Sequence, residues 1–306
     1  MIGRKLRLAG PAGAPAMEIS NPEKVFWPDE GYTKQDLAEY YLRVFPKLSP
    51  YVEDRLLTLE RCPDGMRGKC FFQKQKPQGM PAGTPTKRMA QLTRTGRFTD
   101  YVVGGSLQTQ LALVNLGCIA VHVMASRTGS PRQPDWLCID IDPESGEFAD
   151  AARAGLRVQA GLDVLKLRSY PKTSGSRGLH VLVPLVLGPD VDEVLAFAES
   201  FVARVAAAHP DELTVAHAIP ARRGRVYLDP FRNSFGQTVA APYSVRRRKG
   251  APVSLPLQWS EVRPTLIPTD FNMGNCAGWL RRADPWSDFF RDRQSLKDAA
   301  RLLTRL

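Results

Sequence analysis

The stretch WLCIDID (residues 136–142) combines a run of apolar residues with two acids that are one position apart. The apolar run is typical of a strand that is buried on both faces. Because side chains alternate along a strand, Asp140 and Asp142 are expected on the same face. Two carboxylates at the end of such a strand need a neutralising partner. A divalent metal is the usual one, and carboxylate oxygens suit Mg²⁺ or Mn²⁺.

A third acid, Asp229, ends the apolar segment RVYLD (residues 225–229) in the same manner. Three carboxylates from two strands could hold two metal ions. Such a pair activates a 3′-hydroxyl and stabilises a leaving pyrophosphate. The alternative is that residues 140–143 form an ordinary strand that enters a turn at Asp-Pro, since a D-x-D pattern alone is common.

A glycine-containing loop, TSGSRGLH (residues 173–180), lies between two apolar runs. Glycines let a backbone approach a ligand closely, and serine hydroxyls with Arg177 favour an anion such as a triphosphate. The loop lacks the G-K-[ST] ending of a Walker A motif, and a plain hairpin turn is the alternative. His122 and His180 lie in apolar segments, where a core histidine is the commoner outcome and a phosphate contact is the other.

The pattern of apolar residues predicts an α+β (mixed α/β) fold with a central sheet that is largely antiparallel. Thr33 is expected to cap the first helix, with Asp36 in its first turn. Two short strands are expected around a turn at Thr95-Gly96, and a strand, loop and strand over residues 169–185. Helices are predicted over 36–48, 108–117, 147–167, 191–209 and most of 285–306, and strands over 56–62, 70–74, 118–127, 135–142 and 223–230.

Composition places the chain among globular proteins. It has 306 residues, of which 43% are hydrophobic and 24% charged, so a normal core is possible and global disorder is excluded. Residues 1–17 are expected to be a flexible leader, and residues 18–306 a single domain without repeats or a linker. The five cysteines are scattered and form no C-x-x-C pair, which predicts reduced, partly buried thiols and no structural zinc.

The charge balance is strongly basic. Forty-two Lys and Arg against thirty-one Asp and Glu give a net charge of +11, which attracts polyanions, although solubility alone could explain it. The sequence has no apolar run of the roughly 20 residues that a membrane-spanning helix needs. No apolar signal segment follows the early positive charges, so the cytoplasm is the expected compartment and no membrane partner is expected.

Taken in order along the chain, the motifs resemble the polymerase domain of bacterial ligase D, a branch of the archaeo-eukaryotic primase superfamily. The resemblance covers nearly the whole chain from about residue 18, and the combination is specific although each piece alone is weak. It implies a primase-polymerase-like fold whose catalytic site lies in a cleft between sheets flanked by helices. The motifs are NPEKVFWP (21–28), TK (33–34), RCPDG (61–65), CFFQK (70–74), His122, DIDP (140–143), TSGSRGLH (173–180), Asp229, Asn233, APYSVR (241–246), GAPV (250–253), DPW (284–286) and FF (289–290).

The resemblance also implies a role for each matching residue. The catalytic metal ligands are Asp140, Asp142 and Asp229. The triphosphate-binding loop contributes Ser174, Arg177 and His180, and the nucleotide pocket is lined by His122, Lys74 and Arg246.

Other matching residues are expected to bind DNA. Lys24 and Lys34 would recognise a 5′-phosphate, and a solvated face is the alternative for both. Asn21, at the start of the same motif as Lys24, is also expected to contact DNA. Phe71 and Phe72 would stack on template bases, and strand alternation predicts one buried and one exposed ring. The remaining candidates are two basic stretches, Lys87 to Arg97 and Arg222-Arg223-Gly224-Arg225.

These expectations describe a polymerase. It would extend a DNA 3′-hydroxyl with nucleoside triphosphates, using Mn²⁺ or Mg²⁺ at short gaps or double-strand-break ends that carry a 5′-phosphate. The family often prefers ribonucleotides, with dNTPs possible, and works in non-homologous end joining with the Ku protein and a ligase. One alternative is a DNA-end-binding module without catalysis, against which the three acids argue. The other is a metal-dependent nuclease, against which the glycine loop argues.

Overall fold

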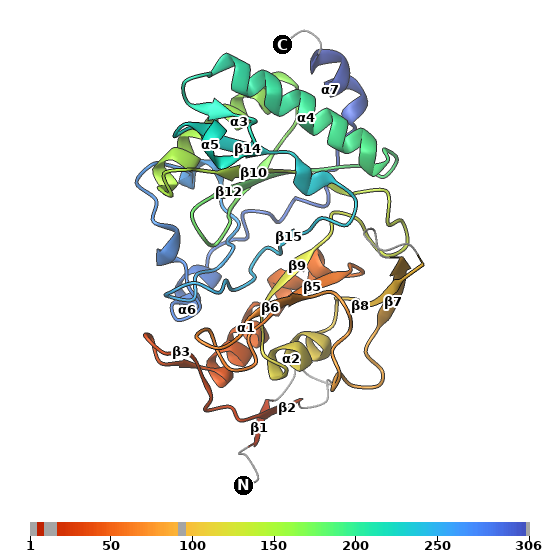
Figure 1. Cartoon of the computed structure of the whole chain (residues 1–306), viewed down its shortest axis with the longest axis vertical. Coiled ribbons are helices and arrows are strands. Elements are labelled where there is room, and N and C mark those ends of the chain that lie inside the picture. The colour runs from red at the N-terminus through yellow and green to blue at the C-terminus, as the bar shows by residue number, and fades with distance from the viewer. Residues whose placement is uncertain (1–4, 9–16, 91–95, 304–306) are drawn as a thin grey trace. The chain divides into compact units, whose positions relative to one another are not determined.

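The computed structural model describes residues 5–8, 17–90 and 96–303 (Figure 1). The chain forms two compact units. The first unit contains residues 1–124, 240–253 and 269–282, and the second contains 125–239, 254–268 and 283–306. Because the units share the chain in alternating segments, no single linker marks the division in the sequence. The single catalytic domain expected over 18–306 stays a prediction.

The first unit is built on antiparallel strands in the order β9-β5-β6, with Ala240 of β15 (Val239–Ala240) next to β9. The bounds are Leu57–Arg61 for β5, Phe71–Gln73 for β6 and Cys118–Val123 for β9. Helices α1 (Lys34–Val52) and α2 (Leu107–Asn115) pack against each other and against β9. The Tyr41 hydroxyl of α1 donates a hydrogen bond of 2.7 Å to the Ile119 carbonyl of β9.

Helix α1 begins where the sequence predicts. The Thr33 hydroxyl accepts from the Asp36 backbone N–H, and the Asp36 carboxylate accepts from the Thr33 N–H, so the two residues cap each other. The helix runs to Val52, past the predicted end at residue 48, and includes Pro46 and Pro50.

The described residues of this unit also form three two-stranded ribbons. Lys5–Leu8 (β1) pairs with Met17–Ser20 (β2), so part of the expected leader is a strand. The other ribbons are β3 (Val25–Trp27) with β4 (Tyr32–Thr33), and β7 (Thr86–Ala90) with β8 (Phe98–Val102). The last pair matches the two strands predicted there, while Thr95 of the predicted turn lies outside the described residues.

The second unit contains a five-stranded sheet in the order β11-β12-β10-β14-β13. Every neighbouring pair is antiparallel except β13 with β14, which confirms the predicted α+β fold with largely antiparallel sheets. One face packs on α3 (Phe148–Val164) and α4 (Val191–Ala208), shown above the strands in Figure 1. The strand bounds are Trp136–Asp142 for β10, Tyr170–Thr173 for β11, Leu179–Pro184 for β12, Leu213–Thr214 for β13 and Val226–Asp229 for β14.

The other face of this sheet is partly covered by aromatic residues from the C-terminal segment. Trp286 and Phe289 stack on each other and both contact Tyr170 of β11, while Phe289 also contacts Trp136 of β10. The prediction that the tail from Pro285 is mostly helical is therefore wrong in its first half. Turns place the aromatic rings on the sheet, and helix α7 begins only at Leu296.

The remaining helices are short. They are α5 (Ile219–Arg222), α6 (Cys276–Leu280), α7 (Leu296–Leu303) and the 3₁₀ turns η1 (Phe231–Asn233), η2 (Trp259–Glu261) and η3 (Pro268–Asp270). Among the described residues, no helix combines the length and the apolar character that crossing a membrane requires.

Two cysteines depart from the predicted reduced state. Cys62 and Cys70, with Cα atoms 4.4 Å apart, form a disulfide across the turn that joins β5 to β6. Cys118, Cys138 and Cys276 are buried free thiols, as expected. The prediction was wrong for the bonded pair because their proximity comes from the pairing of two strands, which their spacing of eight residues does not indicate.

Candidate active site

Four polar residues occupy one row across the sheet of the second unit. His180 of β12 pairs with Lys172 of β11 on one side and with Asp140 of β10 on the other, and Asp140 pairs with Asp229 of β14. Residues directly opposite each other point to the same face of a sheet. Their neighbour Leu179 points to the other face, where it contacts Gly155 of α3. The fold therefore places the row on the face opposite the helices, and we call its two acids, Asp140 and Asp229, the acidic row.

Arg232 lies between the two acids of this row. Its Nε is 2.9 Å from Asp140 Oδ2 and 3.4 Å from Asp229 Oδ2, because η1 turns the chain back immediately after β14. Burial raises the pKa of Asp140, but the contacts with His180 and Arg232 outweigh it and hold that pKa well below its usual range. Burial and the nearby Asp140 carboxylate raise the pKa of Asp229.

Asp142 contacts a different cation. Its side chain is 57% exposed, and its Oδ2 accepts a hydrogen bond of 3.0 Å from Arg222 Nη1 of α5. The Arg222 guanidinium also donates to the His217 carbonyl and lies over the Tyr227 ring. The sequence assigned Arg222 to DNA; in the structure its side chain is buried against Asp142, while Arg223 beside it is exposed.

The acids offer the donor set that a hard divalent cation prefers. The adjacent ends of β10 and β14 carry Asp140, Asp142 and Asp229, whose side-chain donor atoms are all carboxylate oxygens. No group of three His, Cys, Asp or Glu side chains is gathered for a metal within the part of the chain that the structure describes. Arg232 and Arg222 instead supply the positive charge. The residue types fit Mg²⁺ or Mn²⁺, and both guanidinium groups would have to move to admit one.

The glycine loop after β11 is a tight turn shaped by Ser174. Its Oγ accepts hydrogen bonds of 3.2 and 3.1 Å from the backbone N–H groups of Ser176 and Gly178, and its own N–H donates to the Gly178 carbonyl. The exposed Arg177 extends over Gly146. The turn therefore ends one residue before Leu179 and two residues before His180. This places the loop next to the acidic row.

We expect Gly178→Ala to disrupt this loop. A Cβ at residue 178 would lie 2.4 Å from the Ile141 carbonyl oxygen, next to Asp140. Overpacking of this kind costs about 1–3 kcal/mol, and thermal unfolding should show it together with weaker nucleotide binding. Gly129→Ala is the matched control, because no atom lies within 4 Å of its Cβ position. Equal stability of the two variants would contradict the prediction.

The nucleotide-pocket candidates of the first unit lie on and beside its sheet. His122 of β9 pairs with Thr58 of β5, and its ring meets the Phe72 ring edge-on at 5.4 Å. Lys74 is exposed directly after β6, and Arg246 is half-buried. The structure places His122 and Phe72 together and leaves Lys74 on the surface.

Both phenylalanines of β6 are exposed. Phe72 is 61% and Phe71 38% accessible, so the prediction of one buried ring is wrong. The two rings do face opposite sides of the strand, but β6 is the edge strand of its sheet and each ring is only partly covered there. Arg61 lies 5.5 Å from the centre of the Phe71 ring.

The two predicted phosphate-binding lysines differ in their surroundings. Lys24 is half-exposed, and its Nζ forms an ion pair with Asp64 at 2.6 Å. Lys24 lies in a turn that begins at Asn21, whose φ is positive, at 47°. Lys34 is only 5% exposed, and its Nζ donates to the carbonyls of Ser20 and Asn115 at 2.6 and 3.0 Å. Burial lowers the pKa of Lys34.

The other predicted basic surface is the ribbon of β7 and β8. Lys87 and Arg88 of β7 are exposed, and the Arg88 guanidinium lies 4.8 Å from the centre of the exposed Phe98 ring. A cation over an aromatic ring at the surface suits both a nucleic acid and a solvated ribbon.

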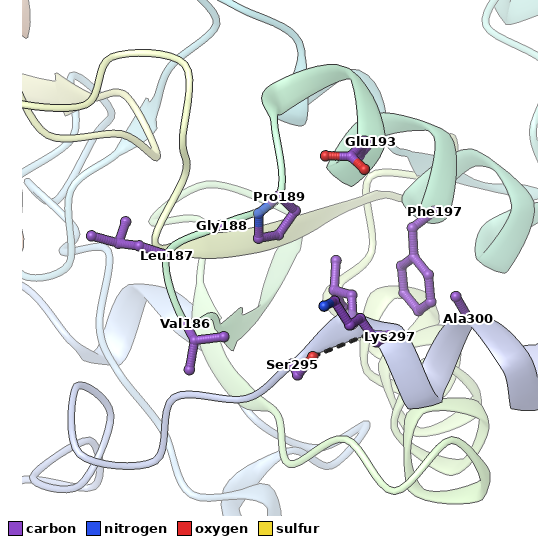
Figure 2. Close-up of a pocket in the computed structure, with 10 residues that line it drawn as sticks. Val186, Leu187, Gly188, Pro189, Glu193, Phe197, Ser295, Lys297 and Ala300 are labelled. Carbon is purple, nitrogen blue, oxygen red and sulfur yellow. Dashed lines mark hydrogen bonds between the residues drawn. The ribbon is translucent and has the colours of Figure 1, made fainter.

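A cavity of about 560 Å³ lies in the second unit. Figure 2 shows the residues that line it. Its lining is mainly apolar and comes from the segment after β12, from α4 and from α7. It lies past the end of β12 that is farther from His180, and none of the predicted site residues lines it.

Sequence reasoning missed Arg232 and Lys172, which contact the predicted residues directly. Arg232 follows Asp229 by three residues, but the turn at η1 that brings it back is visible only in the structure. Lys172 stands one residue before the recognised loop. Strand pairing with His180 could have indicated its position, since strands on either side of a tight loop usually pair.

Residues 33–286 match the family model of the LigD primase-polymerase domain. The chain is 30% identical over 285 residues to the bifunctional non-homologous end joining protein LigD of Bacillus subtilis, covering 92% of this chain and 45% of that protein. It is 30% identical over 311 residues to the multifunctional LigD protein of Pseudomonas aeruginosa, covering 96% and 35%. The chain thus spans less than half the length of these curated relatives.

The fold agrees with a solved structure, the polymerase domain from Mycobacterium tuberculosis ligase D in complex with DNA. The TM-score is 0.83 at 28% identity, over 90% of this chain and 98% of the other. The chain therefore has a primase-polymerase fold. The chain is a member of the LigD primase-polymerase domain family.

Proposed function

We propose that this chain is a DNA-dependent nucleotidyltransferase that adds nucleoside triphosphates to a DNA 3′-hydroxyl at short gaps or broken ends. The observation that carries the proposal is the placement of Asp140, Asp229 and His180 in one cross-strand row, beside the glycine loop. The family and the likeness to a polymerase domain that was solved with DNA support it. The net charge of +11 suits a DNA partner.

The proposed roles follow from the chemistry of each side chain. Asp140, Asp142 and Asp229 would hold two Mn²⁺ or Mg²⁺ ions, which supply Lewis-acid stabilisation of the reacting oxygens. The other proposed contacts are with the triphosphate. Arg177 is exposed and can bind phosphate oxygens in a forked manner, and His180 can donate a single hydrogen bond.

We further propose that the first unit contacts the base, the sugar and the DNA. His122, Lys74 and Arg246 are the candidates for the nucleotide, and Phe71 and Phe72 offer exposed rings for base stacking. Ribonucleotides are the proposed preferred substrates. A role in end joining is proposed from the names of the longer relatives. Ku and a ligase as partners, and a cytoplasmic setting, are proposed from the membership of the LigD primase-polymerase domain family.

The direct test is extension of a labelled primer across a short gap with a 5′-phosphate. NTPs and dNTPs are compared in Mn²⁺ and in Mg²⁺, with a chelator as the metal-free control. Extension by one or a few nucleotides that stops when the metal is removed is the expected result. Retention of the unchanged DNA would favour the end-binding module, and a shortened primer would favour the nuclease.

Recognition of the 5′-phosphate can be separated from stability by two lysine variants. Lys24→Met is expected to lower extension on phosphorylated gaps to the level seen without the phosphate, and to leave the melting temperature nearly unchanged. Lys34→Met should instead destabilise the fold by roughly 2 kcal/mol or more, because two backbone carbonyls lose a charged donor. Primer extension and thermal unfolding measure the two effects. A stable Lys34→Met protein would contradict the structural part of this prediction.

A further inference from the structure

Lys172 is a fully buried lysine that contacts the acidic row through His180. Its exposed fraction is 0%, and its Nζ lies 2.7 Å from His180 Nδ1. The same Nζ donates to Ser254 Oγ at 2.6 Å, and that hydroxyl donates to the Thr173 carbonyl at 2.9 Å. On the other side of the imidazole, His180 Nε2 is 3.3 Å from Asp140 Oδ1. The four side chains thus form one continuous chain from Ser254 to Asp140.

The donor and acceptor roles in this chain are restricted by lysine chemistry. An ammonium group has three hydrogens to donate and no lone pair with which to accept. An ammonium group at Lys172 therefore donates to His180 Nδ1, and Nδ1 then carries no hydrogen. In a neutral imidazole the hydrogen is then on Nε2, the nitrogen that faces the Asp140 carboxylate.

We propose that Lys172 is a positioning residue that fixes the tautomer of His180, so that the N–H of Nε2 always faces the acidic row. Only the consequence of this inference for nucleotide binding rests on the proposed function. An N–H at Nε2 makes His180 a hydrogen-bond donor to an oxygen, first to Asp140 and then to a triphosphate oxygen. It also keeps His180 from ligating a metal ion through that nitrogen, since a ligating nitrogen must be unprotonated.

The position of Lys172 suits this role. Strand pairing sets the backbone of Lys172 opposite His180 of β12. On the other edge of β11, Thr173 forms hydrogen bonds with the backbone of Leu255. The lysine is therefore held from both edges of β11 and can serve as a fixed donor. The competing explanation is that the ammonium only ties β11 to the segment around Ser254, with no influence on the imidazole.

Nuclear magnetic resonance of the whole chain labelled with ¹⁵N-histidine distinguishes these explanations. Long-range ¹H–¹⁵N correlation at a pH near 8, above the ordinary imidazole pKa of about 6.5, reports which ring nitrogen carries the hydrogen. The chain has four histidines, and a His180→Gln variant assigns the signal. No nucleotide or metal is added, so the result does not depend on whether the protein is a polymerase.

We expect the wild-type His180 to show a hydrogen on Nε2 only. Lys172→Met, which keeps the length of the side chain and removes its donor, should give a mixture of the two tautomers or the Nδ1–H form. Ser254→Ala, which keeps Lys172, should leave the Nε2–H form in place. A wild-type signal from Nδ1–H, or an unchanged Nε2–H signal in Lys172→Met, would overturn the proposal. If Lys172→Met does not fold, a wild-type Nδ1–H signal would still overturn the proposal.

The functional consequence has a separate readout. Lys172→Met is expected to weaken nucleotide binding about tenfold, as loss of one hydrogen bond to a phosphate does. Ser254→Ala should stay within about twofold of the wild type. If the wild-type chain binds no nucleotide while the tautomer behaves as expected, the proposed function fails and the role of Lys172 stands.

Discussion

Replacing Asp140 and Asp142 together by Asn is expected to abolish primer extension. The loss should be at least about 10³-fold, because stabilisation by bound metal ions is worth several kcal/mol and each 1.4 kcal/mol is a factor of ten. Asn keeps the shape of the side chain and its carbonyl oxygen, so Arg232 and Arg222 retain an acceptor. The Asn pair removes the two negative charges that a divalent cation requires.

The measurement is single-nucleotide extension of a gapped primer, with binding to the same DNA measured in parallel. Binding should be unchanged, since neither acid attracts a phosphate backbone. Glu199→Gln is the control, because Glu199 is an exposed acid on α4 of the same unit. Extension that survives the double substitution would show that the reaction does not require these two acids, and would contradict the prediction.

Local sequence patterns predicted much of the fold. The strand over residues 136–142 and the helix capped by Thr33 were evident because each depends on neighbours along the chain. The C-terminal segment was predicted wrongly for the opposite reason. Its Trp286 and Phe289 are compatible with a helix by composition, and only the sheet on which they pack determines that they lie in turns.

The sequence indicated the acids and the loop of the candidate site. It did not indicate the cations that contact these acids. Asp140 and Asp142 share a strand face by simple alternation, and Asp229 ends a similar strand. Arg222 and Arg232 contact these acids across turns that the sequence does not reveal, so one was assigned to DNA and the other was not noticed. Pairing across strands also placed Lys172 beside His180, a contact between residues eight positions apart.

The second large effect is expected at Arg232. Its guanidinium contacts both Asp140 and Asp229, so a divalent cation that uses those oxygens has to displace it. Arg232→Met removes this competitor and leaves two carboxylates facing each other. We expect Mn²⁺ to bind the nucleotide-free variant roughly 10–100-fold more tightly than the wild type, because a hydrogen bond between charged groups contributes about 1.5–3 kcal/mol.

Thermal unfolding provides a second test of the prediction for Arg232→Met. In the presence of a chelator, Arg232→Met should melt at a lower temperature than the wild type, since the unpaired carboxylates repel each other. Added Mn²⁺ should then raise its melting temperature more than that of the wild type, because a ligand that binds only the folded state stabilises it in proportion to its affinity. Arg223→Gln removes one positive charge from an exposed position in the same unit and is the matched control.

The sign of the change in affinity decides what Arg232 does. Tighter Mn²⁺ binding in Arg232→Met, measured by titration calorimetry, means that the arginine occupies the place of the cation until a metal arrives. Weaker binding means that the arginine holds Asp140 and Asp229 in the arrangement that a metal needs, which would make it a positioning residue for the acids. Equal binding in Arg232→Met and Arg223→Gln would show that the contacts of 2.9 and 3.4 Å do not compete with the metal.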